Sequence, residues 1–163
     1  MISESAMAVS VSIAAVGAGL MAGIYFVFST FVMQALQELP QIDAAKAMNA
    51  INRVILRSLF MPLFFGTTAL YAWLLFVALQ DHGSPGSSIL FAAAFAYLSG
   101  MFLITLVFNV PLNNELARAE GNEDDLRKTW QLYTLVWVRW NHVRTLCSLL
   151  SALLSVYYLV TYA

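Results

Sequence analysis

Long uncharged stretches alternate with short polar segments along the chain. They predict four helices, at about residues 7–37, 43–80, 88–109 and 125–161. About 20 apolar residues let a helix cross the roughly 30 Å hydrocarbon core of a bilayer. We therefore predict an all-α polytopic membrane protein, a four-transmembrane-helix bundle that forms one domain over residues 1–163.

The polar segments between the stretches contain helix-ending signals. Pro40 follows the first helix, and residues 81–86 form a turn-rich loop. Pro62 removes one backbone donor and predicts a kink in the second helix. Pro111 leaves two interpretations open, because it either ends the third helix or bends it into a further helical segment.

The positive charges indicate an orientation in the membrane. All eight cationic side chains lie between helices one and two or three and four, or at those helix ends: Lys46, Arg53, Arg57, Arg118, Arg127, Lys128, Arg139 and Arg144. The positive-inside rule then places both termini on the non-cytoplasmic side, and we expect a bacterial inner membrane. The uncharged run from Ser5 to Gln37 is too long for a cleaved signal peptide, so none is expected.

Composition supports the membrane assignment and excludes one class of partner. Only 10% of the residues are charged and 61% are hydrophobic, whereas a soluble domain carries about a quarter charged residues. A net charge of −1 argues against nucleic acid as a partner. Cys147 is the single cysteine and cannot form an intrachain disulfide.

Polar side chains recur at steps of four and three along the fourth helix, so they share one face. That face contains Trp137, Asn141, Arg144, Ser148, Ser151 and Ser155, with His142 and Thr145 on an adjacent strip. Exposing such a face to lipid is costly, so it should turn toward the bundle. The uncharged residues from Thr145 to Ala163 span about 28 Å as a helix, which places Arg144 at the bilayer boundary.

Two other segments bring amides to the same depth. Asn109 and Asn113 are four residues apart near the end of the third helix, and Asn52 lies at the cytoplasmic end of the second. The pattern predicts a polar site at the cytoplasmic end of the bundle. The alternative is structural, because arginines at a membrane boundary often reach lipid phosphates and asparagines often cap helices.

The sequence favours neither a metal nor a cofactor. His82 is expected on the opposite membrane side from His142, so one chain cannot build a site of two histidines and one carboxylate there. There is no cysteine pair and no dinucleotide-binding fingerprint. Haem held by His142, or a metal shared between chains, remains the alternative.

Several segments together resemble a known family. They are Phe28-Ser29-Thr30-Phe31-Val32-Met33 with Leu36, Ala47-Met48-Asn49-Ala50-Ile51-Asn52, Asn109-Val110-Pro111-Leu112-Asn113, and Trp137-Val138-Arg139-Trp140-Asn141-His142-Val143-Arg144-Thr145. In this order they resemble the anthrone oxygenase-like integral membrane proteins, a family largely catalogued as a domain of unknown function. Its fungal members in polyketide pathways oxidise an anthrone to an anthraquinone with molecular oxygen.

The resemblance implies a cofactor-independent oxygenase that acts on, or binds, a hydrophobic aromatic molecule. Arg144 and Asn141 would stabilise the enolate oxygen as catalytic residues. His142 would accept the proton, as imidazoles do near neutral pH. The expected substrate-binding residues are Asn109, Asn113, Asn52, Trp137 and Trp140.

Two other functions remain open at this point. The protein is a non-catalytic membrane protein that binds a lipid or small ligand, or it is a subunit of a larger membrane assembly. The expected partners are membrane lipid, a hydrophobic small molecule and, for an enzyme, molecular oxygen. Ala15, Gly19 and Gly23 recur every four residues on the first helix and allow a homo-oligomer.

Overall fold

A computed structural model describes residues 3–81 and 83–162, so His82 lies outside the described residues. Every regular element in these ranges is helical. The elements are α1 (Glu4–Val27), η1 (Phe28–Val32), α2 (Met33–Gln37), α3 (Gln41–Ile55), α4 (Phe60–Gln80), α5 (Ser87–Tyr97), η2 (Leu98–Leu103), η3 (Thr105–Asn109), α6 (Val110–Arg118), η4 (Ala119–Gly121) and α7 (Glu123–Tyr162). Segments η1, η2 and η3 are π-helical, and η4 is a 3₁₀ turn.

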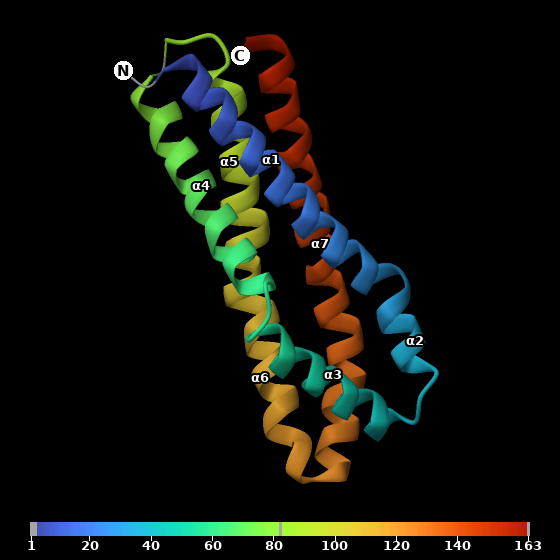
Figure 1. The fold of residues 1–163 in the computed structure, drawn as a ribbon. Coiled ribbons are helices and arrows are strands. Elements are labelled where there is room, and N and C mark those ends of the chain that lie inside the picture. Colours follow the sequence, from blue (N-terminus) through green and yellow to red (C-terminus); the bar gives the residue numbers. More distant parts are fainter. Residues whose placement is uncertain (1–2, 82, 163) are drawn as a thin grey trace.

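Four of the resulting rods are long and apolar enough to cross a membrane: Glu4–Gln37, Phe60–Gln80, Ser87–Gly121 and Glu123–Tyr162. They run side by side as a bundle (Figure 1). The predicted all-α four-helix membrane bundle is confirmed, and the protein is an integral membrane protein. In Figure 1 the two ends of the chain lie at one end of the bundle, here called the termini end. Helix α3 lies toward the opposite end, here called the α3 end.

The predicted helix over residues 43–80 is wrong in one respect, because the structure divides it into α3 and α4. The two helices are separated by residues 56–59, and the hydroxyl of Ser58 accepts a hydrogen bond from the backbone N–H of Phe60 at 3.2 Å. Pro62 therefore lies in the first turn of α4 and does not kink a continuous helix. A proline is tolerated there because first-turn N–H groups have no partner within the helix.

Of the two interpretations left open at Pro111, the structure shows the continued helix. The third rod does not end at Asn109 but runs through η3 into α6 and ends at Gly121. Local π-helical turns are one way in which membrane helices accommodate a proline without losing backbone hydrogen bonds. The extension places Asn113 beside α7, where the hydroxyl of Tyr133 donates to its side chain.

At the termini end, Gly86 fixes the turn before α5. It has φ of 88°, and a Cβ there would lie 2.8 Å from the side chains of Tyr158 and Tyr162. Only glycine meets both conditions without strain. On α1, Ala15 is buried, whereas a Cβ on Gly19 or Gly23 would meet no atom within 4 Å. Those two glycines therefore do not mediate close packing within the described chain.

The buried side chains form two apolar cores. The first occupies the termini half of the bundle and includes Met21, Tyr71 and Tyr97. The second lies at the α3 end and includes Met48 and Trp130. The candidate site lies where these two cores meet.

Candidate functional site

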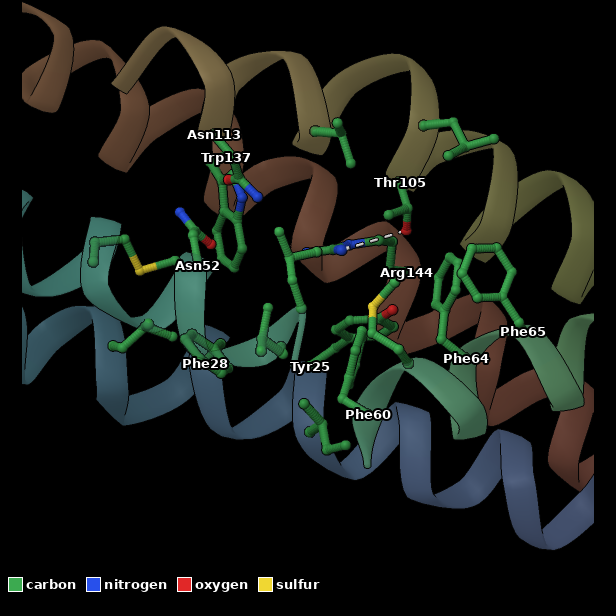
Figure 2. Close-up of a pocket in the computed structure, with 18 residues that line it drawn as sticks. Tyr25, Phe28, Asn52, Phe60, Phe64, Phe65, Thr105, Asn113, Trp137 and Arg144 are labelled. Atoms are coloured by element: carbon green, nitrogen blue, oxygen red, sulfur yellow. Dashed lines mark hydrogen bonds between the residues drawn. The ribbon is translucent and has the colours of Figure 1, made fainter. Parts of the chain in front are cut away.

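A pocket of about 160 Å³ lies between the two cores. Side chains from α1, η1, α3, α4, η3, α6 and α7 line it (Figure 2). Its walls are mainly aliphatic and aromatic. The lining residues with polar atoms are Tyr25, Asn52, Thr105, Asn113, Trp137 and Arg144. Among the described lining residues there is no Asp, Glu, Lys, His or Cys.

Arg144 provides the positive charge of this pocket. Its side chain is only 4% exposed. One guanidinium nitrogen, Nη2, donates to Asn141 Oδ1 at 2.5 Å, and the other, Nη1, donates to Thr105 Oγ1 at 3.4 Å. The guanidinium carbon lies 4.2 Å from the ring centroid of Tyr25 and 5.1 Å from that of Trp137. Aromatic faces attract a desolvated cation, so both rings help to hold the guanidinium in place.

Arg144 has no carboxylate partner in the described part of the chain. The ion pair found there joins Arg53 to Glu120 at 3.2 Å, on the outside of the α3 end. A buried charge without a counter-ion is costly. The cation–π contacts offset only part of that cost, so the site is electrostatically prepared for an anion.

Asn141 fixes the guanidinium from behind the pocket. Its Nδ2 donates to the backbone carbonyl of Tyr25 at 2.7 Å and to Ser29 Oγ at 2.6 Å. The amide oxygen is then oriented toward Arg144. Ser29 belongs to the π-helical segment η1, and such segments often occur at functional sites. Asn141 thus ties α7 to the junction of α1 and η1 and sets the position of Arg144.

Three buried N–H groups on the lining residues have no hydrogen-bond partner in the described chain. They are Asn52 Nδ2, Trp137 Nε1 and Arg144 Nε. Asn113 also lines the pocket, and the hydroxyl of Tyr133 donates to its Oδ1 at 2.7 Å, which leaves the amide nitrogen as the group of Asn113 that can donate to a ligand. Buried polar groups are normally paired. Unpaired donors around an apolar hollow indicate a ligand with acceptor oxygens.

The structure brings together most of the predicted site residues but gives them different positions. Asn52, Asn113, Trp137 and Arg144 line the pocket. Asn141 and Asn109 are buried behind it, and Asn109 Nδ2 donates to the carbonyl of Trp137 at 3.2 Å.

Besides Asn141 and Asn109, two more predicted residues lie outside the pocket lining. His142 is exposed. Trp140 stacks on Phe108 with ring centroids 3.8 Å apart. Both occupy α7 positions next to the inward face, where a shift of one residue turns a side chain by about 100°.

Three residues that sequence reasoning did not assign to the site are part of it. Tyr25 and Thr105 line the pocket and contact Arg144, and Tyr133 orients Asn113. Tyr133 stands four residues before Trp137, on the inward face of α7, so the helical period contained a signal for it. Tyr25 and Thr105 lie on other helices, and no spacing along the chain indicates them.

Metal-binding groups do not cluster in the described residues: no set of three or more His, Cys, Asp and Glu side chains is placed to hold an ion. The exposed side chain of His142 is not part of the pocket.

Comparison with known families adds to this geometry. A model of the anthrone oxygenase family matches residues 53–154. The chain belongs to the anthrone oxygenase family. No curated protein and no solved structure matches it.

The family match includes Asn109, Asn113, Trp137, Asn141 and Arg144. These residues lie in or directly behind the pocket. The match therefore extends over most of the predicted site. It establishes an oxygenase-like membrane protein in general terms, without a substrate.

Proposed function

We propose that the protein binds the ionised form of a hydrophobic, anthrone-type aromatic molecule in the pocket beside Arg144 and oxidises it with molecular oxygen, without a cofactor. One observation carries the proposal. Within the part of the chain that the structure describes, a buried arginine with no carboxylate partner faces an apolar hollow whose unpartnered polar atoms are N–H donors. Such a site favours an oxyanion on a flat apolar body.

The chemistry requires little from the protein beyond this environment. Deprotonation of an anthrone gives an enolate, which is electron-rich enough to react with oxygen directly. One anthrone and one O₂ give one anthraquinone and one water, so the atoms and electrons balance. Arg144 would stabilise the enolate oxygen, with its position set by Asn141, and the aromatic walls would hold the rings. The donors Asn52, Asn113 and Trp137 would bind further oxygens of the substrate.

The proton of the substrate needs an acceptor. His142 was the expected base, but its side chain is exposed and outside the pocket lining. We assign the promotion of deprotonation to Arg144, because a fixed positive charge favours ionisation of a nearby acid. The proton then leaves to solvent and not to a dedicated residue.

The orientation of the molecule belongs to the same proposal. The cationic side chains lie on the segments that connect the helices at the α3 end, or at those helix ends. This distribution supports an α3 end on the cytoplasmic side of a bacterial inner membrane and both termini on the other side. The site would then lie near the cytoplasmic edge of the hydrocarbon core.

Oxygen uptake by the purified protein in lipid nanodiscs tests the proposal. With 1,8-dihydroxyanthrone as substrate, we expect uptake and anthraquinone formation well above the rate in empty nanodiscs, unchanged by a metal chelator. The matched control is Arg144→Met, which should return the rate to that of empty nanodiscs. Equal rates for wild type and this variant would exclude the proposed site. A haem absorption band in the active preparation would exclude cofactor independence.

A non-catalytic binding protein is the second candidate. The observation in its favour is the absence of an acid–base side chain such as His, Asp or Glu among the described lining residues. Arg144-dependent binding of the anthrone without oxygen uptake would support this candidate.

A further inference from the structure

The size of the pocket restricts what it can enclose. Its volume is about 160 Å³, close to the roughly 150 Å³ cavity that holds a benzene molecule. One aromatic ring therefore fits inside. Three fused rings would extend out of the pocket through its mouth.

The mouth of the pocket opens on the side of the bundle. The most exposed lining side chains are Leu56 at 64%, Phe65 at 54% and Leu106 at 45%. Leu56 begins the break between α3 and α4, Phe65 lies on α4 and Leu106 lies on η3. All three are apolar, and two of them, Phe65 and Leu106, belong to membrane-spanning rods, so an apolar ligand can enter between them from the lipid.

Donors stand on two sides of the hollow. Figure 2 shows Asn52, Asn113 and Trp137 grouped on one side of the pocket, with Arg144 and Thr105 farther along it. The guanidinium of Arg144 lies against the Trp137 ring. One oxygen of a bound ring would therefore meet Arg144, and a second would be directed toward the amides of Asn52 and Asn113. The enclosed part of the site thus suits a ring with two oxygen functions, and the mouth suits an apolar substituent.

We propose that this site binds, besides an anthrone-type molecule, a single-ring hydroquinone or quinone with a long apolar chain, whose ring occupies the pocket while the chain passes between Leu56 and Leu106 into the bilayer. This rests on the proposed function, because the oxyanion site beside Arg144 is the same. The reaction is a two-electron oxidation by O₂. Both O–H bonds of the hydroquinone break, two electrons and two protons pass to O₂, and the products are a quinone and hydrogen peroxide.

A pair of leucines on one rod supplies a matched test. Leu106 lines the pocket and is 45% exposed, whereas Leu103 is 51% exposed and does not line it. Leu106→Trp should block the mouth, and Leu103→Trp should not. Binding is measured in nanodiscs by quenching of tryptophan fluorescence, with ligand concentrations expressed per lipid. The probes are decylubiquinone and its ring-only parent, 2,3-dimethoxy-5-methyl-1,4-benzoquinone.

We expect Leu106→Trp to weaken decylubiquinone binding about tenfold or more, equivalent to about 1.4 kcal/mol. It should weaken binding of the ring-only quinone much less, because that ligand has no chain to pass Leu106, and Leu103→Trp should change neither. A second pair repeats the test, with Leu56→Trp in the lining and Leu59→Trp as its control, since Leu59 is 87% exposed and outside the lining. Equal effects within each pair would overturn the proposed path of the chain.

The two proposals fail in different ways. If decylubiquinone does not bind, while 1,8-dihydroxyanthrone is oxidised in an Arg144-dependent manner, the tailed ligand is wrong and the anthrone-type oxygenase stands. If decylubiquinol is oxidised to the quinone with formation of peroxide and Arg144→Met stops this, the inference is supported. If neither compound binds or reacts, both proposals are wrong.

Discussion

Two parts of the inward face of α7 carry polar side chains. The polar groups are paired with other groups of the protein in one part and, within the described chain, partly unpaired in the other. Toward the termini end, the hydroxyls of Tyr71 and Ser155 share a hydrogen bond of 3.0 Å, and Ser151 donates to the carbonyl of Ala93 at 2.6 Å. Toward the α3 end, Arg144 and Trp137 have N–H groups that find no partner among the described residues, and both lie beside the pocket. The first group holds helices together, whereas the second is where we propose that a ligand binds.

Buried polar groups have two uses in this membrane bundle. Paired hydroxyls satisfy one another and allow close helix packing. Unpaired donors cost stability, so they are retained where a ligand completes them. Ser148 Oγ and Tyr97 OH are also unpaired in the described chain, but neither lines the pocket. An unpaired group indicates a site only when it adjoins a hollow.

The largest effect on activity is expected from Arg144→Met. Loss of the cation should lower oxidation of 1,8-dihydroxyanthrone by at least about 100-fold, as for other groups that stabilise an oxyanion. The variant removes a buried charge that has no carboxylate partner in the described chain, but also the hydrogen bonds to Asn141 and Thr105, so the melting temperature should change little. Oxygen uptake and thermal unfolding in detergent measure the two effects. The control is Arg139→Met on the exposed side of α7, and equal losses in both variants would contradict a specific role.

Asn141→Ala should have the next largest effect. Without its amide oxygen the guanidinium is no longer positioned, so binding of an ionisable phenol should fall about tenfold. Binding of the corresponding methyl ether, which cannot ionise, should change much less. A purely structural role would weaken both ligands alike, and titration calorimetry of the pair decides between these outcomes. The control is Asn114→Ala, at an exposed position on α6.

Trp137→Phe should have a smaller effect, because it removes one donor and keeps most of the ring. The indole N–H has no partner in the described chain, so no internal hydrogen bond is lost. We expect ligand binding to weaken about threefold to tenfold, and the smaller ring should also lower the stability by about 1 kcal/mol because Trp137 is buried. Trp140→Phe is the matched control, since Trp140 lies outside the pocket lining. Unchanged binding by Trp137→Phe would remove the indole from the set of donors.

The smallest effect on activity is expected from a substitution at the termini end of the bundle. Tyr71→Phe removes a hydroxyl that is bonded to Ser155, which should cost about 1 kcal/mol of stability. Oxidation of 1,8-dihydroxyanthrone should stay within about twofold of wild type, because Tyr71 is not part of the pocket. Tyr157→Phe, at an exposed tyrosine of the same end, should change neither quantity. An activity loss in Tyr71→Phe would show that the two polar groups are coupled.

Several features of the site follow from the sequence. Trp137, Asn141, Arg144, Ser148, Ser151 and Ser155 are all buried, as their spacing on one helical face predicts. The helical period could not decide whether residues at the edge of that face turn inward or outward. His142 was expected to act as the base, yet its side chain is exposed.

The sequence by itself determined that the protein is a four-helix membrane bundle and which face of α7 turns inward, because hydrophobic length and helical period are local properties of the chain. Tertiary structure alone decided which polar groups find partners. Tyr25 and Thr105 meet Arg144 from other helices, and the break between α3 and α4 shapes the mouth of the pocket. A hollow is the space that packed side chains leave unfilled, so it depends on contacts between residues far apart in the sequence.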